Sequence, residues 1–245
     1  MKKYLIILML FISFVANIYG QEKVPYGNFI YTYSQGLKKV DHVRFERPMF
    51  SSPYFIVDSV KYDNEDLKFY KNEAGFYANI KDQSFWGFAG FAECVSQGEI
   101  NLFKYETTGQ SVGTYNASTG TFTGGGSMNR ISNYYNRGFG ELKDATYKNL
   151  LVELADNPVS QIHLEEYRKA GKRQNWLIVA GSVAVGAGLA TLISKTSKDY
   201  GDNPEPSVAP NVALIIGGMA SFGVSYHIYL SKPKHLQKAV DTYNM

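Results

Sequence analysis

Two long uncharged apolar segments constrain this chain more than any other feature of its sequence. Trp176–Ser194 contains 19 residues and Val212–Ser231 contains 20, and neither segment holds Asp, Glu, Lys or Arg. At about 1.5 Å per residue, a helix of either length spans the roughly 30 Å hydrocarbon core of a bilayer. A chain of 245 residues offers little protein to cover two such helices, because both are apolar on every face. We therefore expect a two-helix transmembrane hairpin rather than two buried core helices.

The ends of the two segments carry aromatic residues that suit the boundary between lipid and water. Trp176 opens the first segment, whereas Tyr226 and Tyr229 lie near the end of the second, and we expect all three to act as interfacial anchors. Residues 195–211 between the segments are polar and contain three prolines, which predicts a loop. His227 is the only histidine in either segment, and its place between the two tyrosines favours an interfacial position over a functional one.

Small residues recur at every fourth position of both segments, and this spacing places them on one face of each helix. The residues that we expect in helix–helix packing are Ala180, Ala184, Gly186, Gly188, Ala213, Gly217 and Ser221. One interpretation is that the two helices pack against each other through these faces. The other is a glycine-zipper surface through which copies of the chain assemble into an oligomer or pore. The spacing alone does not distinguish the two.

The first 20 residues have the order of regions that is typical of secretory signal peptides. Two lysines precede an apolar run from Tyr4 to Val15, and Gly20 is a suitable residue before a cleavage site. The alternative is an uncleaved signal anchor, and either version exports the residues that follow. We therefore expect residues 21–175 on the outer side of the membrane that the chain crosses.

The distribution of basic residues conflicts with this orientation. The outer flanks of the hairpin would lie on the exported side, and they carry Arg168, Lys169, Lys172, Arg173, Lys232, Lys234 and Lys238, whereas the linker carries only Lys195 and Lys198. The positive-inside rule favours the reverse arrangement. We give priority to the signal peptide, because the first segment usually dominates orientation. The choice between an inner and an outer membrane stays open.

Residues 21–140 are rich in strand-forming residues, and we expect a mainly antiparallel β domain that is either a sandwich or barrel-like. Asp66–Tyr70 and Phe76–Ile80 alternate apolar and polar residues on either side of Gly75, which predicts a β-hairpin. Phe85–Val95 and Ile100–Glu106 predict a second hairpin with its turn at Gly98.

Two further segments, Asn28–Tyr33 and Tyr54–Val57, are strand candidates by composition. Gly109–Asn129 is rich in Gly, Ser and Thr, and we expect a mobile hairpin tip or loop there, with a flexible turn at its three consecutive glycines. A phosphate-binding loop is rejected for this segment, because no Lys-Ser or Lys-Thr follows the glycines.

Residues 141–175 are expected to form an amphipathic helical connector. Tyr147, Leu150, Leu151 and Leu154 follow helical spacing, with Asp144 as a suitable N-cap. Pro158 suits the first turn of a second helix that continues toward the first apolar segment. Residues 232–245 form a basic C-terminal tail.

The sequence carries no recognisable catalytic or metal-binding motif. The four histidines lack metal-ligand spacing, and His163 with Glu166 is only a weak pair. Cys94 is the single cysteine, and we expect it to be a buried structural residue. Without the first 20 residues the chain has 23 basic and 22 acidic residues, which argues against nucleic-acid binding. We expect no cofactor and no metal, while a hydrolase of glycans or peptides stays as an alternative, because folding can bring two carboxylates together.

Two segments, Tyr147–Pro158 (YKNLLVELADNP) and His235–Asn244 (HLQKAVDTYN), carry a resemblance. With the signal, the Tyr- and Phe-rich β region and the Gly/Ala-rich hairpin, the chain resembles uncharacterised exported membrane proteins of Bacteroidota-type bacteria. The resemblance implies a location in the bacterial cell envelope and no assigned activity. Asp58-Ser59-Val60 is similar to the Asp-Ser/Thr-apolar acceptor for O-glycosylation in that phylum, which makes Ser59 a candidate modification site.

These features together predict a non-enzymatic envelope protein. Its β domain would be anchored by the hairpin and would act as a binding or structural module. The expected partners are the lipid bilayer and either other envelope proteins or further copies of this chain.

Overall fold

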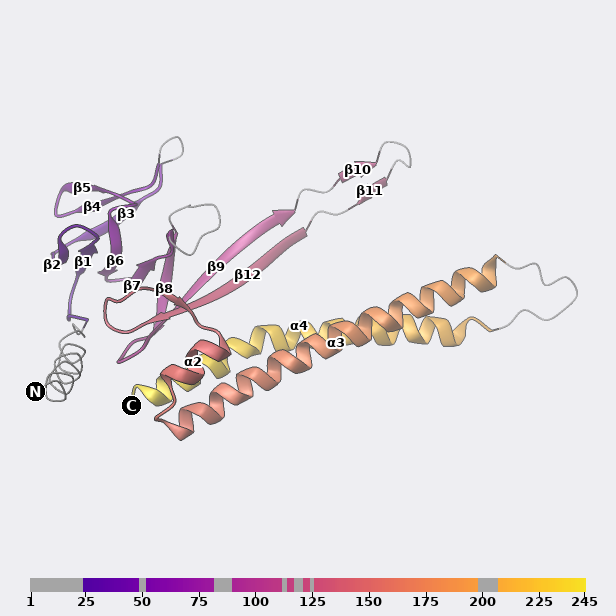
Figure 1. The fold of residues 1–245 in the computed structure, drawn as a ribbon. Helices are drawn as coiled ribbons and strands as arrows, with labels where there is room; N and C mark the ends of the chain where they lie inside the picture. Colours follow the sequence, from indigo (N-terminus) through magenta and orange to yellow (C-terminus); the bar gives the residue numbers. More distant parts are fainter. Residues whose placement is uncertain are drawn as a thin grey trace, which may run out of the picture. The chain divides into compact units, whose positions relative to one another are not determined.

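The computed structural model describes residues 24–48, 52–81, 90–111, 114–116, 121–123, 126–197 and 207–245. The chain divides into two compact units, which are drawn in Figure 1. The first unit contains Met1–Asn149 together with Asn244–Met245, and the second contains Leu150–Tyr243. The expected signal peptide lies outside the described residues.

The first unit is built on an eight-stranded antiparallel sheet in the order β13-β12-β9-β8-β7-β6-β1-β2. Its strands are β1 (Phe29–Thr32), β2 (Gly36–Lys39), β6 (Leu67–Asn72), β7 (Gly75–Asn79), β8 (Phe91–Ser96), β9 (Asn101–Ser111), β12 (Gly126–Asn136) and β13 (Lys143–Asp144). A three-stranded sheet contains β3 (Val43–Glu46), β4 (Tyr54–Val57) and β5 (Val60–Asp63), and a two-stranded sheet contains β10 (Thr114–Asn116) and β11 (Thr121–Thr123). The prediction of a mainly antiparallel β domain is confirmed.

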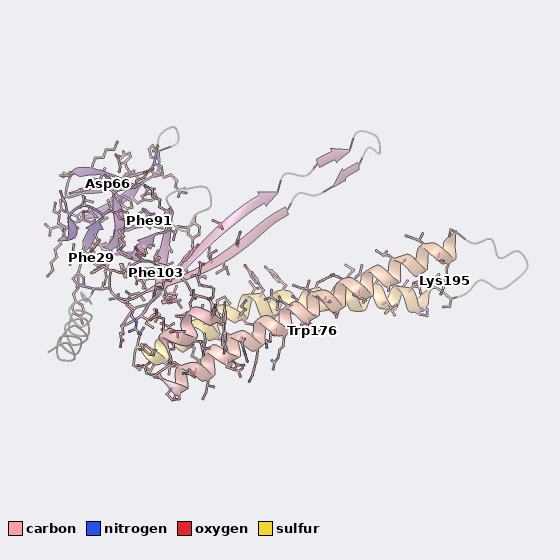
Figure 2. The ribbon with its side chains drawn as sticks, viewed as in Figure 1. Phe29, Asp66, Phe91, Phe103, Trp176 and Lys195 are labelled. Carbon is pink, nitrogen blue, oxygen red and sulfur yellow. The ribbon has the colours of Figure 1, made fainter. Side chains whose placement is uncertain are left out.

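The core of this unit is divided between the two faces of the large sheet, because successive residues of a strand point to opposite faces. Phe29 belongs to a cluster of buried rings that includes Phe69 and Phe103, whereas its neighbour Ile30 belongs to a second cluster. The second cluster also contains Phe55 of β4, so the three-stranded sheet packs on one face of the large sheet. Figure 2 labels Phe29 and Phe103 among the side chains of this unit.

Buried asparagine side chains stabilise the turns of the sheet through hydrogen bonds. The Asn79 side-chain amide donates to the backbone oxygens of Asn64 at 3.1 Å and Leu67 at 2.8 Å. The Asn101 amide donates to the side-chain oxygen of Asn136 at 3.1 Å. These bonds satisfy polar groups that would be costly to bury unpaired, and they tie adjacent strands together where the backbone leaves the ladder.

Both predicted hairpins are present. β6 pairs with β7 around a turn in which the Asn72 side chain accepts hydrogen bonds from the N–H groups of Ala74 and Gly75. β8 pairs with β9, although residues 85–89 of the expected strand lie outside the described residues. The strands expected at Asn28–Tyr33 and Tyr54–Val57 correspond to β1 and β4.

Gly109–Asn129, which was expected to be a hairpin tip or loop, belongs to antiparallel strand pairs over its described residues. β9 and β12 pair continuously, from the pair of Asn101 with Asn136 to the pair of Ser111 with Gly126. β10 pairs with β11 in the residues between these two strands. The antiparallel ladder satisfies the described backbone groups of this Gly- and Thr-rich segment in pairs, which favours the hairpin over the loop.

In the described part of the chain, three helices follow the sheet, namely α2 (Tyr147–Glu153), α3 (Pro158–Thr196) and α4 (Ala209–Tyr243). Asp144 is not the N-cap of α2, because it belongs to β13; the Thr146 hydroxyl accepts the hydrogen bond from the Asn149 N–H at 3.2 Å instead. α3 begins with Pro158 in its first turn, as the sequence predicted, and its N-cap is Asn157. The C-terminal segment that was expected to be a basic tail is helical as far as Tyr243.

Candidate functional site in the helical hairpin

α3 and α4 lie side by side as an antiparallel hairpin with a glycine contact in its middle (Figure 1). A Cβ atom placed on Gly181 would lie 2.9 Å from the Gly218 oxygen, and one on Gly218 would lie 2.7 Å from the Gly181 oxygen. A Cβ on Gly188 would lie 2.9 Å from the Asn211 oxygen. The helices therefore approach so closely at these positions that only glycine fits without a shift.

The contacts between the helices repeat every seven residues. The successive facing pairs are Tyr167 with Lys232, Gln174 with Ser225, Gly181 with Gly218 and Gly188 with Asn211. A step of seven along α3 thus matches a step of seven back along α4. Hydrophobic or small residues with a heptad period are the pattern of a left-handed coiled coil. We call this row of pairs the seam.

The seam changes chemistry along its length. The Lys232 ammonium lies 4.9 Å from the centre of the Tyr167 ring, and the Ser225 hydroxyl donates to the backbone oxygen of Gln174 at 3.4 Å. The pairs nearer the linker are built from glycine and Asn211. One end of the hairpin is therefore joined by polar contacts, while the other end is joined by close backbone packing.

The structure places the seven predicted packing residues on different faces. Gly188 is buried in the seam, and Ala184 and Ser221 are half-buried. Ala180, Gly186, Ala213 and Gly217 are exposed, and a Cβ on Gly186 or Gly217 would meet nothing within 4 Å. The helix interface therefore follows a seven-residue repeat, which corrects the four-residue stripe expected from sequence. Gly181 and Gly218, which sequence reasoning missed, form its closest contact.

The outer faces of both helices expose large apolar side chains along the apolar segments. The exposed residues are Trp176, Ile178, Val179, Val183, Leu189, Ile193, Val212, Leu214, Ile216, Met219, Phe222, Val224, Tyr226 and Leu230. Both α3 and α4 are long and apolar enough to cross a membrane, and only 11% of the most apolar window of each is buried. This surface differs from that of a core helix in a globular protein, whose apolar stripe is covered.

The expected interfacial anchors gather near one end of the apolar part. Trp176 is 73% exposed and Tyr226 is 61% exposed, and the Ser225–Gln174 bond places the two side chains at nearly the same level of the hairpin. The Tyr226 and Tyr229 rings are stacked at 6.4 Å. Lys195 lies toward the other end of the apolar part of α3, as Figure 2 shows.

Basic residues lie beyond the level of Trp176 and Tyr226, on the side of the hairpin away from the linker. Arg168 and Lys169 pair with Glu165 and Glu166 in the same helix. Lys232 is half-buried against Tyr167, and burial lowers the pKa of the Lys232 ammonium and raises the pKa of the Tyr167 hydroxyl. Both shifts follow from the cost of a charge that is withdrawn from water.

The β unit contains a surface cavity of about 540 Å³ between β3, β4 and the β6–β7 turn, with Asp58, Ser59 and Glu73 in its wall. Asp58 and Ser59 both have positive φ, at 46° and 71°, as a two-residue type I′ hairpin turn requires. One Asp58 carboxylate oxygen accepts hydrogen bonds from the N–H groups of Asp41 and His42. Asp58 thus fastens the turn, and Ser59 is exposed at its tip.

The remaining reactive side chains stand apart from one another. Cys94 is partly buried rather than fully buried as expected, and burial raises the pKa of its thiol to about 12, which makes it a poor nucleophile at neutral pH. His163 and Glu166 are partly exposed on α3, and His227 is exposed on α4. Among the described residues no group of three or more His, Cys, Asp or Glu side chains is arranged to hold a metal ion.

Comparison with known proteins adds no assignment to this geometry. No protein-family model, no curated protein and no solved structure matches the chain.

Proposed function

We propose that the hairpin of α3 and α4 inserts into a bilayer and anchors the β unit to a bacterial cell envelope membrane. The observation that carries the proposal is the apolar outer surface of both helices, which the seam leaves uncovered. Burying a Val, Leu or Ile side chain gains about 1.5–3 kcal/mol over leaving it exposed. Exposure of this surface to water would therefore cost on the order of 10 kcal/mol or more, and lipid removes that cost.

The β unit is the part that acts, in this proposal, through contacts with other envelope proteins or with further copies of the chain. Its buried rings form a packed core, and the Asp58 carboxylate in its cavity wall is committed to the turn. A non-enzymatic binding or structural role fits these features better than hydrolysis, because a hydrolase needs a pair of free acid and base groups that face a substrate.

The first test compares the membrane retention of two lysine variants. Val183 lies on the outer face of α3 at 66% exposure, and Val152 of α2 is exposed at 76% outside the apolar segments. Val183→Lys should weaken retention in the membrane pellet after urea or alkaline carbonate washing, because a lysine at the centre of a transmembrane helix costs about 3 kcal/mol. Val152→Lys should leave retention unchanged. Release of the unaltered protein by both washes would reject the anchor.

The export of residues 21–175 needs its own test, since the basic flanks favour the reverse orientation. A protease-cleavable tag after Gln21 should be cut from the outer side of the cytoplasmic membrane. A tag that stays protected until that membrane is lysed would place the β unit in the cytoplasm.

A second candidate function is self-assembly through the outer face of the hairpin. It is favoured by the open space over Gly186, Gly217 and Gly223, because small residues let helices approach closely in lipid. Gly217→Leu should abolish a cross-linked ladder of oligomers without disturbing the seam. An unchanged ladder would contradict this assembly surface.

A further inference from the structure

We propose that the basic collar formed by Lys172, Arg173 and Lys232 binds the phosphate headgroups of anionic phospholipids. This inference rests on the proposed insertion of the hairpin into a bilayer. It adds a lipid class and a site to that insertion.

The collar lies at headgroup depth when Trp176 marks the lipid–water boundary. Lys172 and Arg173 precede Trp176 by four and three residues, which is about 5–6 Å along a helix. The polar layer on each side of the hydrocarbon core is roughly 5–8 Å thick. The two side chains on α3 therefore start within the layer that contains the phosphates.

Lys232 reaches the same layer from the other helix. Its Nζ atom lies 4.9 Å from the centre of the Tyr167 ring and would lie 3.6 Å from a Cβ on Gly171, which is four residues closer to Trp176. Side chains of a helix lean toward its N-terminus, and the N-terminus of α4 is at the linker. The ammonium is therefore carried toward the membrane, through the space that Gly171 leaves.

The cationic side chains of the collar are available to bind an anionic ligand. Arg168 and Lys169 are engaged by Glu165 and Glu166, whereas Lys172, Arg173 and Lys232 form no ion pair with a carboxylate in the part of the chain that the structure describes. The half-buried Lys232 has the face of Tyr167 as its near neighbour. A phosphate oxygen would supply the full counter-charge that a ring face does not.

At the opposite end of the hairpin, the described lysine nearest the apolar segment is engaged by the protein itself. Lys195 donates to the Ser207 backbone oxygen at 2.8 Å, which holds it at the start of the linker. It therefore provides a matched control: a lysine just outside the same apolar segment, with its ammonium committed to the protein.

The experiment measures quenching of Trp176 fluorescence by brominated lipids in the full-length protein, with the chain's other tryptophan changed by Trp86→Phe. Brominated phosphatidylglycerol and brominated phosphatidylcholine are compared in mixed bilayers. A collar site predicts that phosphatidylglycerol is preferred about fivefold or more, since each cation near an anionic surface contributes about that factor. Lys172→Gln, Arg173→Gln and Lys232→Gln together should bring the preference close to one, whereas Lys195→Gln should not.

A second variant with Lys172→Arg, Arg173→Lys and Lys232→Arg keeps the three positive charges. It should retain the preference for phosphatidylglycerol, and it tests the collar even if the neutral variant misfolds. Equal quenching by both lipids in the unaltered protein, or an unchanged preference in the neutral variant, overturns the collar site. Absence of quenching by either lipid overturns the insertion itself, so the two proposals fail in different ways.

Discussion

Adding one methyl group to adjacent glycines of α4 should have opposite effects on the stability of the hairpin. A Cβ at Gly218 would lie 2.6 Å from a methyl carbon of Val185 and 2.7 Å from the Gly181 oxygen, whereas a Cβ at Gly217 would meet nothing within 4 Å. Ordinary non-bonded contacts are about 3.5 Å or longer. Gly218→Ala therefore requires the helices to separate by roughly 0.8 Å.

The magnitudes follow from two opposing terms. Alanine is favoured over glycine inside a helix by about 0.8–1 kcal/mol, and this is the whole effect expected at Gly217. At Gly218 the strain of inserting a methyl group into a packed contact costs about 1–3 kcal/mol, which exceeds the gain in most of that range. We expect Gly217→Ala to stabilise the hairpin slightly and Gly218→Ala to destabilise it by up to about 2 kcal/mol.

The assay is reversible unfolding of the detergent-solubilised protein by increasing fractions of sodium dodecyl sulfate, with helix content followed by circular dichroism. The two variants should move the midpoint in opposite directions. Gly186→Ala is a second control, since its site is also open. If Gly217→Ala destabilises as strongly as Gly218→Ala, the seven-residue seam is refuted and the four-residue stripe becomes the packing face.

Three predictions concern the β unit. Phe69→Ala should cost about 3–5 kcal/mol of folding free energy in denaturant titrations, because Phe69 is fully buried and its ring lies 5.6–6.2 Å from those of Phe76, Phe103 and Phe139; a loss below 1 kcal/mol would contradict a tightly packed aromatic core. The raised pKa of Cys94 favours the neutral thiol in the folded state, so stability should be constant below pH 9 and should fall on the order of 1 kcal/mol per pH unit from about 9 to 12; Cys94→Ala should flatten part of that decline, and an identical decline would show that the thiol is not buried. O-glycosylation at Ser59 should appear as a mass increase of the protein from its native host that Ser59→Ala removes, and an unmodified tip would reject the motif.

The sequence was sufficient to predict the large divisions of the chain, because those divisions depend on composition and period. The alternation around Gly75 predicted β6 and β7, and the uncharged runs predicted a pair of long helices. The cap of α2 was assigned two residues too early, since Asp144 and Thr146 are equally suitable by type and only the end of β13 distinguishes them.

The packing face of the hairpin was harder to predict, for a physical reason. Glycine and alanine occur around the whole of α3, so several faces carry small residues at the right spacing. Tyr167, Gln174, Gly181 and Gly188 are spaced by seven along α3, but Gln174 contributes only its backbone oxygen to the contact with Ser225. Its side-chain type therefore gave no signal for the packing face.

The seam also explains how His227, an ionisable residue near the end of the second apolar segment, is accommodated. The Gln174–Ser225 contact sets Trp176 of α3 level with the residues just before Tyr226. If Trp176 marks the lipid boundary, then Tyr226, His227 and Tyr229 lie on its polar side, and the part of α4 in lipid is displaced toward the linker relative to Val212–Ser231. His227 then needs no partner inside the membrane, because headgroups and water reach it. From Trp176 to Ile193 α3 rises about 26 Å, which is close to the hydrocarbon thickness, so α3 spans the bilayer from this boundary.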